Sequence, residues 1–211
     1  DPVAESWELS CHHDGQSIIS NGEFSGKTLA QYIETVGKQV IGTKAPKDKD
    51  FPILIKFIDA KQSLSVQVHP DDKYALLHEG ESGKTEMWYV MDATPDATLI
   101  YGFTHEISHQ EFERRIKDNT LLEVCNQVPI KKGDVFFIEA GTLHAIGAGA
   151  LIAEIQQSSN STYRVYDYGR VGKDGKLREL HIEKALAVTK LEPPTRKPEP
   201  IAKLTAFADY D

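Results

Sequence analysis

Short segments rich in apolar residues dominate the middle of the chain. Residues 63–69 alternate apolar and polar positions and stop at Pro70, which is the pattern of a strand with one buried face. Comparable strands are predicted at residues 51–58, 86–91, 97–101, 135–138, 141–146 and 150–156. Turn residues separate these runs. Many short strands joined by turns are typical of a β-sandwich or barrel rather than of an alternating βαβ arrangement.

Three short helices are predicted outside these strands. Thr28 and Gln31 form a capping-box pattern that opens a helix ending near Gln39. A second pattern of this kind begins at Ser108 and leads into a helix that runs to about residue 118. Residues 182–188 carry a third helical pattern.

Prolines set the end of the chain apart. They stand at positions 193, 194, 198 and 200 and indicate an extended linker. We therefore expect residues 1–192 to form one domain and residues 193–211 to form a linker and a final strand. The segment 201–211 is too short for a domain, so it is either a strand of the main sheet or the start of a further β domain.

Composition narrows the class of protein. With 40% hydrophobic residues the chain is ordinary for a globular protein, and no run approaches the roughly 20 apolar residues of a membrane span. The net charge of −8 argues against nucleic acid as the main partner, since phosphate backbones bind basic faces. Cys11 and Cys125 are the two cysteines, which excludes a disulfide scaffold, and no secretory signal is visible. These features predict a cytoplasmic protein without a membrane partner.

Several metal-type residues fall on matching faces of the predicted strands. Gln67 and His69 are two residues apart and project from the same face of one strand, as do Lys84 and Glu86 at the start of another. His144 lies in a glycine-bounded segment further along. In a barrel, Gln67, His69, Glu86 and His144 would converge as a cage for a divalent metal. The alternative is a buried polar cluster whose members satisfy one another.

The segment 133–144 has a distinctive form. It runs from Gly133 through a strand and Gly141 to His144, and it resembles the second motif of the cupins. Glu139 stands where that motif usually has proline, and Gly147 where it often has asparagine. The resemblance implies an all-β double-stranded β-helix, or jelly roll, with a few short helices.

A more specific resemblance begins at residues 64–72, Leu-Ser-Val-Gln-Val-His-Pro-Asp-Asp, which resemble the signature of the type I phosphomannose isomerases. Further matches to that zinc-dependent cupin family follow in order at Glu5-Ser6-Trp7 with His12, Lys56, Lys84-Thr85-Glu86, Gly141 to Ala145, Glu154, Arg164 and Arg170. The resemblance extends from about Glu5 to Ala206 and is closest to the short bacterial form. The family's Tyr-x-Trp-Gly segment has no match here, and we expect its C-terminal β domain to be missing unless the last strand is its stub.

The resemblance implies a zinc-dependent isomerase that interconverts mannose 6-phosphate and fructose 6-phosphate through an enediol. One Zn²⁺ per chain would be held by Gln67, His69, Glu86 and His144. The partner would be a small phosphorylated sugar.

The resemblance also implies roles for the residues around the metal. Arg164 would stabilise charge, since its guanidinium stays protonated and cannot act as a base. Lys84 and Glu154 would relay protons, and burial is expected to move the pKa of a lysine toward neutrality. Substrate contacts would come from Ser65, Lys56, Arg170, Trp7 and His12.

Two other functions remain open from the sequence. A cupin that binds a metal and a sugar phosphate without catalysis would need no proton-handling residues, so Arg164 and Glu154 favour the isomerase. An iron-dependent oxygenase would use a facial triad, in which two histidines and a carboxylate bind the metal. The Gln67-x-His69 pair departs from that pattern.

Overall fold

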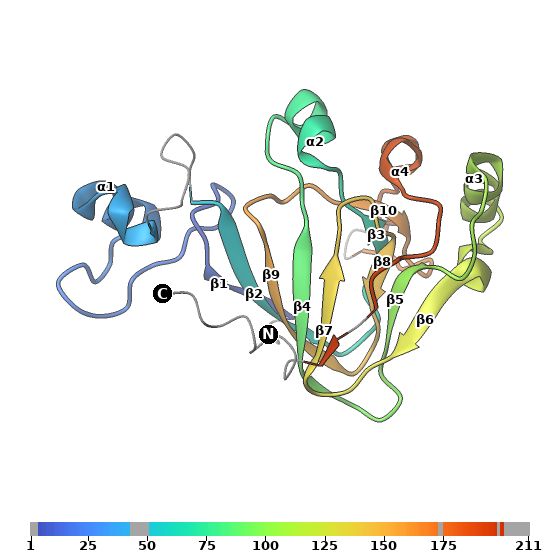
Figure 1. Ribbon diagram of the computed structural model, residues 1–211, viewed down its shortest axis with the longest axis horizontal. Coiled ribbons are helices and arrows are strands. Elements are labelled where there is room, and N and C mark those ends of the chain that lie inside the picture. The colour runs from blue at the N-terminus through green and yellow to red at the C-terminus, as the bar shows by residue number, and fades with distance from the viewer. Residues whose placement is uncertain (1–3, 43–50, 173–174, 198, 201–211) are drawn as a thin grey trace.

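Two antiparallel β-sheets pack face to face, and short helices lie at one end and at the edges (Figure 1). The computed structural model describes residues 4–42, 51–172, 175–197 and 199–200. Within these residues the first sheet has the strand order β1 (Glu5–Leu9), β2 (Ile53–Ala60), β9 (Ala150–Gln157), β4 (Glu86–Ala93), β7 (Asp134–Ile138), β11 (Glu199–Pro200). The second sheet has the order β10 (Tyr163–Tyr166), β3 (Val66–Val68), β8 (His144–Ile146), β5 (Thr98–Phe103), β6 (Cys125–Pro129).

The helices are short. They are α1 (Leu29–Val36), α2 (Asp72–His78), α3 (His109–Lys117) and α4 (Ile182–Val188), with 3₁₀ turns η1 (Lys38–Ile41) and η2 (Leu121–Val124). The capping box of Thr28 with Gln31 is present at α1, and the Ser108 side chain caps α3. Both predicted helix starts are therefore confirmed.

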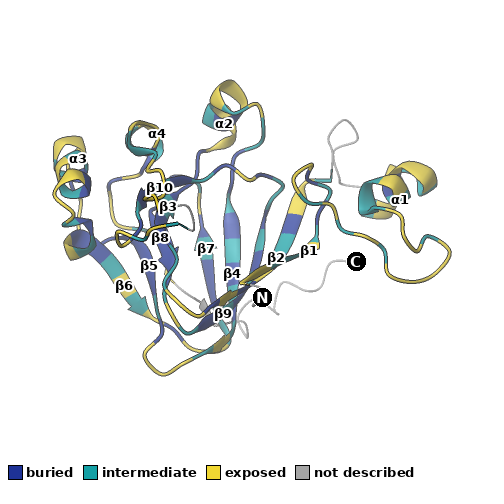
Figure 2. Ribbon diagram, turned by 180° about the vertical axis from the view of Figure 1, so that it is seen from behind, coloured by how far each residue is buried: buried dark blue, intermediate teal, exposed yellow. Residues whose placement is uncertain are grey.

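The core has two parts on either side of the second sheet. Between the sheets, Trp88, Phe136 and Ile152 belong to one buried cluster. On the other face of the second sheet, α3 and α4 add Phe112 and Ala185 to a second cluster (Figure 2). The second sheet is thus buried on both faces, which fixes the residues that it turns toward the first sheet.

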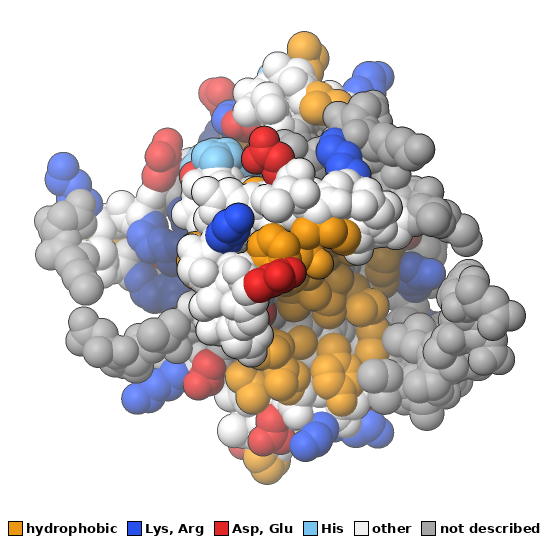
Figure 3. Space-filling model, turned by 90° about the vertical axis from the view of Figure 1, so that its left-hand side faces the viewer, with side chains coloured by type: hydrophobic (Ala, Val, Ile, Leu, Met, Phe, Trp, Pro, Cys, Tyr) orange, Lys and Arg blue, Asp and Glu red, His pale blue; other side chains and the backbone are white. Residues whose placement is uncertain are grey.

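The outer face of the first sheet is also apolar. Ile53 and Phe57 on β2 are each 39% exposed there, beside half-buried Ala153 and Ile155 of β9. Figure 3, which views the molecule from the α1 side, shows hydrophobic side chains gathered in one area. The alternation along β2 therefore separates two apolar faces rather than an apolar face from a polar one.

The inner face becomes polar toward one end of the sandwich. Register places Lys56 of β2, Glu154 of β9 and Trp88 of β4 side by side on that face. In the second sheet Gln67 lies opposite His144. The two sheets therefore bring the predicted chemical residues into one region.

The all-β prediction is confirmed, and each strand predicted between residues 51 and 157 has a counterpart. Pattern analysis missed β1, β6, β10 and α2, which are short or lack clear periodicity. At the C-terminal end, Glu199 pairs with Val135 and Pro200 with Asp134, so β11 joins the first sheet. Residues 201–211 of the predicted final strand lie outside the described residues.

Candidate metal centre and substrate cavity

His69, Glu86 and His144 come together from three different strand ends. His69 follows β3, Glu86 begins β4 and His144 begins β8. The two imidazole Nε2 atoms are 3.1 Å apart, and each lies 3.4 Å from one oxygen of Glu86. All three side chains are buried, and the three ligand atoms lie within 4.8 Å of one another.

Backbone carbonyls orient both histidines. The Nδ1 of His69 donates to the carbonyl of Ser161 at 2.9 Å, and the Nδ1 of His144 donates to the carbonyl of Thr142 at 2.8 Å. Because a carbonyl only accepts, each Nδ1 carries the proton and each Nε2 presents its lone pair to the centre. Burial and the nearby Lys84 lower the pKa of His69 to about 3, and burial also lowers the pKa of His144. Both rings are thus neutral and suited to bind a metal ion.

Glycine 141 ties the two histidine segments together. Its N–H donates to the carbonyl of His69 at 2.8 Å, which links the turn before β8 to the residue after β3. Its φ of +86° is unfavourable for other residues, and a Cβ would lie 2.9 Å from the carbonyl of Val188. The second glycine of the cupin-like motif therefore has a structural reason.

The carboxylate of Glu86 completes a donor set for a divalent cation. Neither of its oxygens accepts a hydrogen bond from the described residues, and Lys84 Nζ lies 3.4 Å away. Although burial opposes ionisation, the positive charge of Lys84 holds the pKa of this carboxyl below its usual range. Two lone pairs and a carboxylate that face one another repel, and a cation between them removes the repulsion. Two imidazoles and a carboxylate are a recurrent zinc ligand set.

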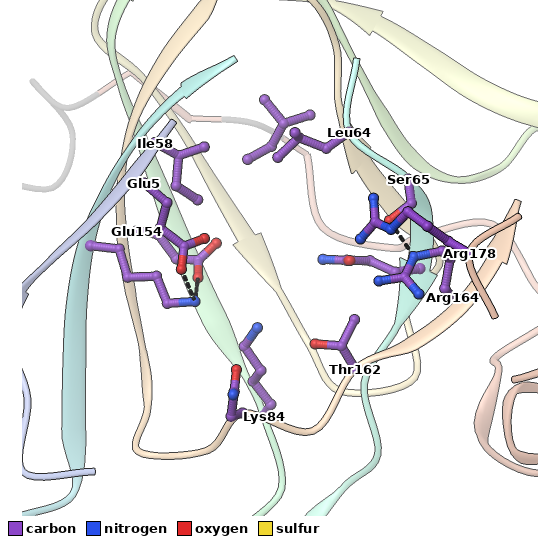
Figure 4. A pocket seen from close by; sticks show the side chains of 13 residues that line it. Glu5, Ile58, Leu64, Ser65, Lys84, Glu154, Thr162, Arg164 and Arg178 are labelled. Carbon is purple, nitrogen blue, oxygen red and sulfur yellow. Dashed lines mark hydrogen bonds and ion pairs between the residues drawn. The ribbon is translucent and has the colours of Figure 1, made fainter. Parts of the chain in front are cut away.

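Gln67 joins the centre to a neighbouring cavity. Its amide nitrogen lies 3.4 Å from His144 Nε2, and a half-turn of the amide would present the oxygen instead. The same side chain lines a cavity of about 470 Å³. The cavity lining consists of Glu5, Lys56, Ile58, Leu64, Ser65, Gln67, Lys84, Ile146, Glu154, Asn160, Thr162, Arg164 and Arg178 (Figure 4).

One wall of the cavity carries acidic groups around a lysine. Lys56 Nζ lies 3.5 Å from Glu5 Oε1 and 3.7 Å from Glu154 Oε1. The indole N–H of Trp88 donates to the other oxygen of Glu154 at 2.9 Å. Burial raises the pKa of Glu154 to about 6, and repulsion from Glu86 adds to the rise. Glu154 can therefore exchange a proton near neutral pH.

Lys84 lies between the cavity and the metal centre. Burial lowers its pKa, as expected, but the negative charges of Glu86 and Glu154 outweigh burial and leave its pKa above the usual value. The expected shift toward neutrality is therefore wrong. Lys84 keeps its charge, so it can hold negative charge on a ligand.

Exchange of Glu154 for glutamine should change how stability depends on pH. The folded-state pKa of about 6 exceeds the ordinary 4.5, so the neutral form stabilises the folded state fully below pH 4.5 and this contribution is lost as pH rises through 6. We expect metal-free wild type to lose about 2 kcal/mol more than Glu154→Gln between pH 4.5 and 7 in urea unfolding. The exposed Glu183→Gln serves as control. A difference that stays constant across this range would show that folding does not raise the pKa of Glu154.

The facing wall carries two guanidinium groups. Arg164 lies opposite Gln67 in the pairing of β10 with β3, and its Nε donates to Ser65 Oγ at 3.3 Å. Its Nη1 donates to the carbonyl of Glu179 at 3.0 Å. Arg178 lines the same wall (Figure 4). Sequence reasoning missed Arg178 because it lies in an irregular segment without periodicity.

Three expected substrate contacts lie outside the cavity lining in the described part of the chain. Arg170 forms an ion pair with Asp167 and donates to the carbonyl of Ser63 at 2.7 Å. Trp7 packs against Lys56, whose Nζ is 5.0 Å from the ring centre. His12 Nε2 lies 3.1 Å from Glu81. The other predicted site residues line the cavity or form the centre.

The two-sheet fold and the His69, Glu86 and His144 cluster define a cupin-like protein with a candidate divalent-metal centre. Residues 1–86 match the family model of the type I phosphomannose isomerase catalytic domain. The chain is 48% identical over 187 residues to a probable mannose-6-phosphate isomerase from Bacillus subtilis, covering 88% of this chain and 58% of that protein. A mannose-6-phosphate isomerase from Streptococcus mutans is 44% identical over 194 residues, covering 91% and 60%.

A solved structure agrees with these matches. The crystal structure of the Bacillus subtilis mannose 6-phosphate isomerase has a TM-score of 0.82 and 41% identity, covering 89% of this chain and 59% of that one. Over about nine tenths of its own length the chain is therefore similar to type I phosphomannose isomerases. It spans about three fifths of the length of these relatives. None of the helices described is long and apolar enough to cross a membrane.

Proposed function

We propose that this chain carries the active site of a zinc-dependent mannose-6-phosphate isomerase that interconverts mannose 6-phosphate and fructose 6-phosphate. One observation carries the proposal: the buried His69, Glu86 and His144 donor set adjoins a polar cavity. Gln67 and Lys84 connect the two, because they line the cavity and also lie 3.4 Å from atoms of the donor set. The relatives described above are mannose-6-phosphate isomerases, which supports the same reaction.

The reaction requires a proton to leave one carbon of the open sugar and another to return at its neighbour, through an enediol. Zinc bound by His69, Glu86, His144 and Gln67 would supply a Lewis acid for negative charge on substrate oxygens. Glu154 would accept and return the proton, because its pKa of about 6 matches neutral conditions. Lys84 would hold negative charge on the substrate, since its ammonium group stays protonated.

Arg164 would stabilise the enediol from the opposite wall. Its Nε and Nη1 are held by Ser65 and by the carbonyl of Glu179, so the guanidinium is fixed before substrate arrives. Such preorganised donors cost no reorganisation during the reaction. Lys56 would position Glu154 through its ion pair, and Trp7 would support Lys56 from outside the cavity.

Removal of the metal should remove the activity. We expect a coupled assay on mannose 6-phosphate to lose at least about 100-fold in rate after chelation, because a Lewis acid contributes several kcal/mol to such a reaction. Added Zn²⁺ should restore the rate, and elemental analysis should find one zinc per chain. Buffer exchange without chelator is the control. Interconversion that persists in zinc-free protein would overturn the proposal, and zinc binding without interconversion would leave a binding protein.

A further inference from the structure

The arginine wall of the cavity carries more positive charge than its own carboxylates can balance. Arg164, Arg170 and Arg178 gather around Asp167, whose side chain is 5% exposed. Arg170 contacts this carboxylate more closely than Arg178, whose Nη1 is 3.5 Å from the same oxygen. No carboxylate of the described residues forms an ion pair with Arg164. Because the negative charge of the exposed Glu179 also acts on Arg164, three cations face two anions and leave about one positive charge, which favours an anionic ligand.

Arg178 is placed to meet a ligand, whereas Arg170 is not. The Arg178 side chain is 45% exposed and lines the cavity, so it lies at the mouth. Arg170 is engaged by Asp167 and by the carbonyl of Ser63 and lies outside the lining. Figure 4 shows Arg178 beside Ser65 and Arg164 on the wall opposite Glu154. The Ser65 hydroxyl accepts from Arg164 and still has its own proton to donate.

We propose that Arg178, with the Ser65 hydroxyl, binds the phosphate of a phosphomonoester substrate at the mouth of the cavity. The proposal rests on the proposed function, which supplies the sugar to which this phosphate is attached. A phosphate monoester carries between −1.5 and −2 charges near pH 7, and a guanidinium fork matches its oxygens. Arg164 then lies between the phosphate and the metal centre, because it pairs with Gln67 across the adjacent strands. Arg170 does not contact the phosphate. It holds Asp167, which also pairs with Arg178.

The test compares Arg178→Gln, Arg178→Lys and Arg170→Gln in the full, zinc-loaded chain, with the exposed Arg114→Gln as matched control. Titration calorimetry measures binding of inorganic phosphate, and steady-state assays measure KM and kcat for mannose 6-phosphate. Loss of one charge-assisted contact should weaken phosphate binding and raise KM about 10- to 100-fold in Arg178→Gln. Zinc content and kcat should stay within about threefold of wild type. Arg178→Lys should recover part of the affinity.

Two results would overturn the proposal. One is phosphate affinity and KM that are unchanged in Arg178→Gln but weakened in Arg170→Gln, which would move the subsite. The other is a loss of kcat at unchanged KM in Arg178→Gln. Phosphate binding by calorimetry does not depend on turnover. A chain that does not isomerise, but loses phosphate binding in Arg178→Gln, would therefore disprove the proposed function and support the subsite.

Discussion

Replacement of His144 by alanine should abolish stoichiometric zinc binding and lower kcat/KM at least about 1,000-fold, since the metal supplies several kcal/mol. His144 Nε2 lies at the middle of the donor set, 3.1 Å from His69 Nε2 and 3.4 Å from Glu86. Without this ring, one imidazole, one carboxylate and the weakly binding Gln67 amide remain to compete with water for the cation. Elemental analysis of the purified variant and the coupled assay measure the two effects.

The exposed His109 on α3 provides the matched control, because His109→Ala removes an imidazole that is remote from the centre. Its zinc content and rate should equal those of wild type. His144→Ala protein that folds and keeps one zinc per chain would refute the assignment of His144 as a ligand. Thermal unfolding by circular dichroism separates loss of the metal from loss of the fold.

Replacement of Arg164 by alanine should lower kcat about 100- to 1,000-fold and leave zinc content unchanged. The fold-change is that expected for removal of a preorganised donor that stabilises negative charge. The side-chain hydrogen bonds of Arg164 go to Ser65 and to the carbonyl of Glu179 rather than to His69, Glu86 or His144. Steady-state kinetics and elemental analysis of the same preparation provide the measurement.

Arg164→Lys separates the effect of the positive charge from the effect of the planar guanidinium group. It keeps the positive charge but not the planar fork, so we expect it to recover only a minor part of the lost kcat. Loss of zinc from Arg164→Ala would show that the residue supports the metal centre instead. An unchanged kcat with raised KM would make Arg164 a residue of substrate binding alone.

The closeness of Gln67, His69 and His144 could be predicted from local patterns. Gln67 and His69 share one strand-like segment, and the glycines around His144 mark a tight turn before its strand. Gly141 fulfils that expectation through its positive φ and its bond to the His69 carbonyl. The period of a strand indicates the face of the sheet on which each side chain lies. It is therefore informative where strands are regular.

The local sequence pattern predicted neither the charge balance around Lys84 nor the place of Arg178 at the cavity. The raised pKa of Lys84 depends on two carboxylates that register brings beside it from β4 and β9. Arg178 reaches the cavity from a segment with no regular pattern, while Arg170 turns to Asp167 instead. Such outcomes depend on long-range packing, which a single sequence does not encode in its local pattern.

The chain contains two tryptophans, and both touch the site. Trp88 meets the His144 ring edge-on, with ring centres 5.3 Å apart, and donates to Glu154. Trp7 lies under the ammonium group of Lys56 and beside His12. Indole fluorescence responds to nearby charge and to ring contacts. The indole emission of this protein therefore reports from the candidate site, with Trp88 sensing His144 and Trp7 sensing the lysine that holds Glu154.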